Sequence, residues 1–130
     1  MTSLRSPLGA ALGKGSAHSG TAHWWAQRVS SVALVPLTLW FVLSLLMLPD
    51  LQYLTVRAWL ATPFSAFLAM LLIAVLAYHA DLGTNIVTED YVHSAGMRTL
   101  ILLLLRFAYV VVAGLSIFAI LRITFAAPLL

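Results

Sequence analysis

The sequence contains no cysteine, which excludes disulfide bonds, thiolate-bound iron–sulfur clusters and zinc sites of the cysteine type. Charge is also scarce, because Asp, Glu, Lys and Arg make up only 8% of the residues, against about a quarter in soluble proteins. The seven basic residues are too few and too scattered to form a nucleic-acid-binding patch. Any iron–sulfur centre that exchanges electrons with this chain therefore has to be carried by a partner.

Most of the sequence is apolar. Of the 130 residues, 62% are hydrophobic, which is more apolar surface than one small soluble domain can bury beneath a polar surface. Lipid can take the place of that polar surface. The composition predicts a single integral membrane domain.

Three apolar runs are long enough to cross a bilayer. The first, 29–48, has twenty residues without a charge, or roughly 30 Å of helix. The second begins at Thr62-Pro63, an N-cap followed by a proline at the first helical position. The third, 99–121, is interrupted only by Arg106. These runs predict an all-α membrane protein with three transmembrane helices, at about residues 26–48, 62–83 and 97–123.

The ends of the chain and its basic residues suggest how it is organised. Residues 1–21 are rich in Gly, Ser and Ala and lack an apolar stretch of signal-peptide type, so we expect a mobile tail before an anchor domain over 22–130. Arg5, Lys14 and Arg28 flank the first helix on its N-terminal side, whereas the loop 49–61 contains only Arg57. The positive-inside rule then predicts a cytoplasmic N-terminus, or a matrix N-terminus in an organelle.

A polar segment, 78–93, stands out against the apolar background, and His79 is its first histidine. By composition alone this segment is an ordinary solvated loop. An imidazole at the end of an apolar helix can instead hydrogen-bond a neighbouring helix or ligate a metal. Gly83 lies about 40° from His79, one turn further along, and would leave room for a flat macrocycle. A haem with two histidine ligands needs them on opposite faces, and we place His18, His23 and His93 in tail or loop, so the second ligand should come from another subunit.

Asp90-Tyr91 follows His79 by eleven and twelve residues. If the helix continued, Asp90 would lie about 20° from His79 and roughly 16 Å along the axis. A phenol and a carboxylate at the membrane surface can hydrogen-bond a quinone carbonyl and supply protons. The alternative is an interfacial tyrosine beside a solvated acid.

Taken together, His79, Gly83 and the Asp90-Tyr91 pair resemble the pattern of the D-type membrane anchor of succinate dehydrogenase (succinate:ubiquinone oxidoreductase). Val92-His93 and the basic entry into the first helix at Arg28 are also similar to this family, and the resemblance covers about 22–121. The residues between Gly83 and Asp90 lack the glutamine and the aromatic that often occur there.

The resemblance implies specific roles. His79 would be one axial ligand of haem b, with Gly83 and Arg28 in the haem pocket and the other ligand on a C-type anchor subunit. Tyr91 would hydrogen-bond ubiquinone, with Asp90 beside it at the mouth of the pocket, and Arg28 is assigned near both the propionates and the quinone. No role is carried over to His23, because its spacing from Arg28 differs from that in some members.

The resemblance also implies a function. The chain would be a multi-pass anchor of respiratory complex II in the cytoplasmic membrane or the mitochondrial inner membrane, without catalysis in isolation. FAD would be on a flavoprotein subunit and the clusters on an iron–sulfur subunit, from which electrons would reach ubiquinone. The alternatives are a fumarate reductase anchor, a homodimeric b-type cytochrome using His79 twice, and a structural membrane subunit without a cofactor.

Three further polar residues are assigned less specific roles. Arg106 is expected to snorkel to the cytoplasmic headgroups, with pairing to a partner helix or a haem propionate as the alternative. Asp81 and Glu89 are expected to be solvated, unless a soluble partner covers them.

Overall fold

The computed structural model describes residues 18–125, which form four helices joined by short connections. These helices are α2 (His18–Leu46), α3 (Tyr53–Ala61), α4 (Pro63–Tyr91) and α5 (Ala95–Phe125). Three of them, α2, α4 and α5, are long and apolar enough to cross a membrane. This confirms the predicted all-α fold with three membrane-spanning helices.

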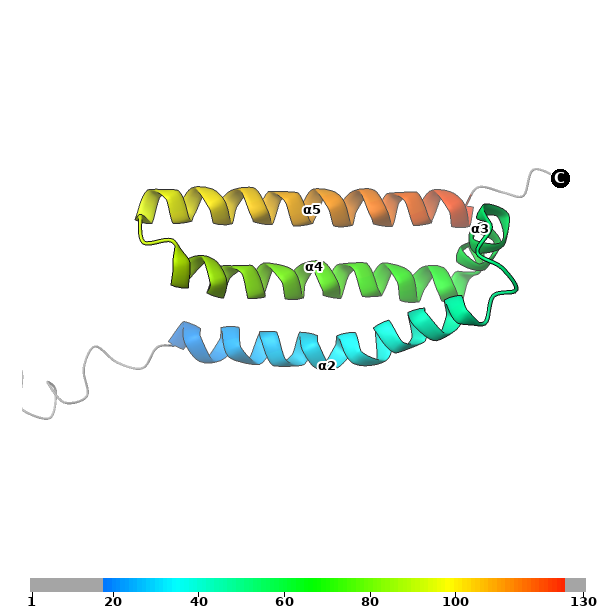
Figure 1. Ribbon diagram of the computed structural model, residues 1–130, viewed down its shortest axis with the longest axis horizontal. Coiled ribbons are helices and arrows are strands. Elements are labelled where there is room, and N and C mark those ends of the chain that lie inside the picture. Colours follow the sequence, from blue (N-terminus) through cyan, green and yellow to red (C-terminus); the bar gives the residue numbers. More distant parts are fainter. Residues whose placement is uncertain (1–17, 126–130) are drawn as a thin grey trace, which may run out of the picture.

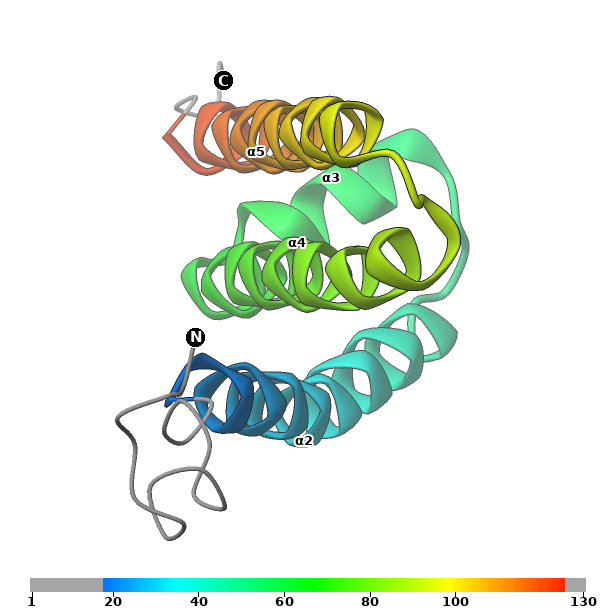
Figure 2. The ribbon, with the colours of Figure 1, turned by 90° about the vertical axis from the view of Figure 1, so that its left-hand side faces the viewer.

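Helix α4 lies between α2 and α5, as two perpendicular views show (Figures 1 and 2). The start of α2 and the connection 92–94 lie at one end of the bundle, which we call the turn end. Helix α3 and the last turn of α5 lie at the opposite end, which we call the α3 end (Figure 1). The two ends therefore face opposite sides of the membrane.

Two helix boundaries differ from the sequence-based expectation. Helix α2 already begins at His18, so 18–21 are helical rather than part of a tail, and 1–17 lie outside the described residues. Helix α4 ends at Tyr91 rather than near residue 83, which reduces the connection expected between about residues 83 and 97 to 92–94. The hydroxyls of Thr84 and Thr88 donate to the carbonyls four residues earlier, at 2.9 and 2.7 Å. These polar side chains are satisfied within the helix, so the polar segment stays helical.

Helix α3 was not predicted, because its nine residues fall in the expected loop 49–61. A helix this short is unstable by itself, so tertiary packing has to stabilise it. Trp59 stacks on Trp40 of α2, with ring centroids 5.9 Å apart and an interplanar angle of 27°. Thr62 begins α4 with Pro63 at its first turn, as predicted, although the Thr62 hydroxyl donates to the Trp59 carbonyl rather than capping α4.

The buried core lies toward the α3 end. Ala66 and Ala69 of α4 meet Ile120 of α5 there, with Trp40 and Met70 packed around them. Small residues let membrane helices approach closely. Most large apolar side chains point outward instead. Their exposure would be unfavourable in water but not against lipid or a partner helix. Figure 1 also shows the axis of α2 changing direction in its second half, beyond Pro36, as expected for a proline inside a helix.

Candidate functional site

His79 projects from α4 toward α2, where two polar side chains hold its ring. Its Nδ1 atom lies 2.9 Å from the Oγ atom of Ser30. The Ser30 hydroxyl donates to the carbonyl of Ala26 at 2.8 Å, so its oxygen is left to accept a hydrogen bond. The tautomer that satisfies both bonds carries its proton on Nδ1 and its lone pair on Nε2. Ser30 is only 5% exposed, so water does not compete for this bond.

The Nε2 atom of His79 faces Gln27. The amide nitrogen of Gln27 donates to this lone pair at 3.3 Å. The same amide nitrogen lies 3.6 Å from the position that a Cβ atom on Gly83 would occupy, which is ordinary van der Waals contact. The room beside Gly83 that the sequence suggested for a macrocycle is therefore next to the Gln27 amide.

A cavity of about 400 Å³ opens beside His79, between α2 and α4. It is lined by His23, Trp24, Gln27, Arg28, Ser31, His79 and Ile86. The Arg28 guanidinium lies over the Trp24 ring, 5.5 Å from its centroid. His79 and Arg28, two of the predicted site residues, thus line the same cavity. Gly83 does not line it but lies next to Gln27, which does.

The position of His23 corrects the sequence analysis. We expected it in a tail or loop, but α2 begins before it and carries it into the wall of the His79 cavity. Its Nε2 atom and the Oε1 atom of Gln27 are buried without a hydrogen-bond partner in the described structure. Buried polar atoms are normally satisfied. Both atoms are therefore available to hydrogen-bond a polar group that enters the cavity.

The donor set fits a haem better than a metal ion held by protein alone. Within residues 18–125, no group of three or more His, Cys, Asp or Glu side chains is placed to hold a metal ion. A haem iron needs only axial ligands from protein, because the porphyrin supplies the other four. The oriented imidazole of His79 meets that requirement for one ligand, and the two unsatisfied polar atoms could contact polar edges of the haem.

Tyr91 and Asp90 lie apart from this cavity, in the last turn of α4. Both are exposed, and Tyr91 retains 79% of its accessible surface. Since α4 is continuous, they lie roughly 16 Å along the axis from His79. Neither residue lines any of the four cavities described within residues 18–125, so a quinone site here would draw on surfaces of partner subunits.

Sequence reasoning missed Gln27, Ser30 and Ser31. All three face the site from the first part of α2 and are polar residues at the start of an otherwise apolar helix. Polar side chains inside membrane helices usually mark contacts with another helix or a ligand. That signal is present in the sequence, but no site role was predicted from it.

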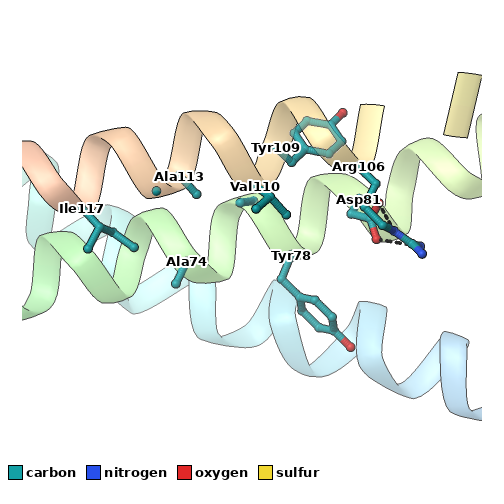
Figure 3. Close-up of a pocket in the computed structure, with 10 residues that line it drawn as sticks. Ala74, Tyr78, Asp81, Arg106, Tyr109, Val110, Ala113 and Ile117 are labelled. Atoms are coloured by element: carbon teal, nitrogen blue, oxygen red, sulfur yellow. Dashed lines mark hydrogen bonds and ion pairs between the residues drawn. The ribbon is translucent and has the colours of Figure 1, made fainter. Parts of the chain in front are cut away.

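Arg106 and Asp81 form an ion pair between α5 and α4 (Figure 3). The Arg106 Nη2 and Nε atoms donate to the two carboxylate oxygens at 3.1 and 3.3 Å. This corrects two expectations, since Arg106 is paired within the chain and Asp81 is not merely solvated. The pair lines an apolar cavity of about 460 Å³ beside residues such as Ala74 and Ile117. It forms because α4 remains helical through Asp81, which brings the carboxylate opposite α5.

Removing Arg106 should destabilise the protein more than removing the charge of Asp81. The Arg106 side chain is 62% exposed and can reorient toward the headgroups, whereas Asp81 is only 20% exposed. We expect Arg106→Leu to destabilise the assembled protein by about 1 kcal/mol and Asp81→Asn by less. Thermal unfolding of the purified complex measures both. The double variant should be more stable than Arg106→Leu alone, and equal losses for both single variants would contradict this asymmetry.

Comparison with known proteins identifies relatives over most of the chain. Residues 2–113 match the model of the family described as "Succinate dehydrogenase/Fumarate reductase transmembrane subunit". The chain is 34% identical over 116 residues to a succinate dehydrogenase hydrophobic membrane anchor subunit of Paracoccus denitrificans, covering 89% of each chain. It is 31% identical over 102 residues to the subunit of the same name from Rickettsia conorii, covering 77% of this chain and 81% of that one. A succinate dehydrogenase membrane anchor subunit of Reclinomonas americana is 29% identical over 91 residues, covering 68% and 76%.

Proposed function

The chain belongs to the succinate dehydrogenase/fumarate reductase transmembrane subunit family, and we propose that it anchors a succinate dehydrogenase complex. In this proposal His79 is one axial ligand of haem b, and Tyr91, Asp90 and Arg28 contribute to a ubiquinone site. The observation that carries the haem assignment is the His79 ring in the cavity wall, whose Nδ1 is held by Ser30 and whose Nε2 lone pair is contacted by the Gln27 amide.

When bound, haem b would supply a one-electron carrier within the membrane domain. Ser30 would keep the His79 ring in one orientation, because a hydrogen bond to the outer nitrogen fixes the tautomer and raises the basicity of the other. The Gln27 amide donates to that other nitrogen at 3.3 Å, so Gln27 and the iron would compete for the same lone pair. Arg28 contributes a positive charge to the same cavity, which favours an anionic edge such as a propionate.

The quinone end of the proposal rests on Tyr91 and Asp90. The Tyr91 phenol would donate a hydrogen bond to a quinone carbonyl, and Asp90 would supply protons during reduction. Because both residues are exposed in the described structure, an iron–sulfur subunit and a C-type anchor subunit would complete the pocket. Succinate would be oxidised at FAD on a flavoprotein subunit, and its electrons would reach ubiquinone through the iron–sulfur subunit.

The proposed location is the cytoplasmic membrane, with the N-terminus and the turn end on the cytoplasmic side. The basic residues that precede and enter the first helix support this orientation. A fumarate reductase anchor is the second candidate, because the matching family includes both enzymes. The potential of the haem and the type of quinone that co-purifies separate the two.

Ser30→Ala tests whether this hydroxyl positions the iron ligand. Loss of such a partner lowers the affinity for the metal group by about 10- to 100-fold, so we expect less haem in the purified complex and a shifted haem potential. Ser31→Ala is the matched control, since the Ser31 hydroxyl donates to the Gln27 carbonyl at 2.7 Å and makes no hydrogen bond to His79. Identical haem content and potential in the Ser30 variant and the wild type would show that Ser30 does not act on the ligand.

A further inference from the structure

Two arginines share a cavity at the α3 end, far from the His79 cavity. Arg57 projects from α3 and Arg122 from the last turn of α5. Together with Tyr53, Ala119 and Ile123 they line a space of about 380 Å³. The two guanidinium groups come from helices that are far apart in sequence, so the fold rather than local spacing brings them together.

No carboxylate within residues 18–125 forms an ion pair with either arginine. Of the four acidic residues of the chain, only Asp50 lies near the α3 end. Its carboxylate accepts the backbone N–H of Gln52 at 3.1 Å. The Thr55 hydroxyl and this N–H lower the pKa of Asp50 below its ordinary value. Asp50 is thus engaged at the start of α3, and the charges of the two arginines are not balanced by it.

The cavity lies at the depth where a membrane span meets the headgroups. Arg122 is in the last turn of the third span, and α3 crosses the end of the bundle (Figures 1 and 2). Tyr53 and Leu54 of α3 are 73% and 71% exposed, as expected for side chains that contact lipid at the interface. In the proposed orientation this is the side on which basic residues are ordinarily scarce. The positive charges of two arginines at one cavity therefore favour binding of an anionic group.

We propose that this cavity binds the phosphodiester headgroup of an anionic phospholipid in the leaflet at the α3 end. Arginine suits this role because its planar guanidinium donates paired hydrogen bonds to phosphate oxygens. Ala119 and Ile123 give the cavity an apolar wall, beside which the first segment of an acyl chain can lie. A free phosphate ion would match the charge but leave this apolar wall unused. The site is independent of the haem and quinone assignments.

The test titrates phosphatidylglycerol into the purified complex in neutral detergent and follows bound lipid by native mass spectrometry. Each arginine near a membrane surface contributes about 1 kcal/mol to binding an anionic lipid. Arg57→Gln and Arg122→Gln should therefore each raise the half-saturating concentration about fivefold, and the double variant about thirtyfold. Arg98→Gln, at the turn end of α5, is the matched control and should leave this concentration unchanged.

Two further measurements distinguish a bound phospholipid from a bound phosphate ion. Inorganic phosphate, titrated in place of the lipid, should neither compete with phosphatidylglycerol nor raise the thermal unfolding temperature, and equal stabilisation by phosphate would overturn the lipid assignment. Unchanged lipid binding in the double variant would overturn the site itself. If the double variant does not assemble, the single variants decide, because wild-type lipid binding in both would equally overturn the proposal.

Discussion

Replacing His79 by alanine is expected to remove nearly all haem b absorbance from the purified complex. In the proposed function this imidazole is the ligand that the chain supplies to the iron, and Ser30 already orients its ring. Alanine leaves no donor in that position, and neither Ser30 nor the Gln27 amide is a suitable replacement for an imidazole on haem iron. The measurement is the reduced-minus-oxidised spectrum of the complex, normalised to its flavin content.

His93→Ala is the matched control for this experiment. His93 is an exposed histidine in the connection after α4, outside the His79 cavity. Its loss should leave the spectrum unchanged. A wild-type spectrum in the His79 variant would refute the ligand role, whereas loss of haem in both variants would point to a general defect of assembly.

Tyr91→Phe is expected to lower quinone reductase activity at least about tenfold, because the phenol hydroxyl would lose its hydrogen bond to the quinone carbonyl. Succinate oxidation with an artificial electron acceptor should stay close to the wild-type rate, since that reaction bypasses the quinone. The ratio of the two activities, measured on the same preparation, is the relevant quantity. The haem spectrum of this variant should also be unchanged.

Tyr78→Phe supplies the matched control on the same helix. Tyr78 lines the α4–α5 cavity with Asp81 and Arg106 (Figure 3), away from the end of α4. Its hydroxyl should be dispensable for quinone reduction. A Tyr91 variant that loses both activities equally, or a Tyr78 variant that loses quinone reduction to the same extent, would argue against a specific quinone role for Tyr91.

The three spans could be predicted from the sequence because lipid restricts the backbone so strongly. In a bilayer without water every N–H and C=O group needs an internal partner, so a long apolar run has to be a helix. Thr62-Pro63 marked the start of α4 for an equally local reason, since proline is favoured in the first turn. The end of α4 was misjudged, because polar residues at 84 and 88 suggested a loop when their hydroxyls bond to the helix itself.

The sequence by itself thus determined the number of spans, their approximate limits and the residues with unusual chemistry, His79 and Asp90-Tyr91 among them. Only the tertiary structure decided what those residues meet: Ser30 and Gln27 at the imidazole, Asp81 at Arg106, and α3 across the end of the bundle. The reason is physical. A helix that is apolar on all sides has no stripe that marks its packing face, so the rotation of each helix about its axis, and hence every contact between them, depends on how the side chains of all the helices pack together.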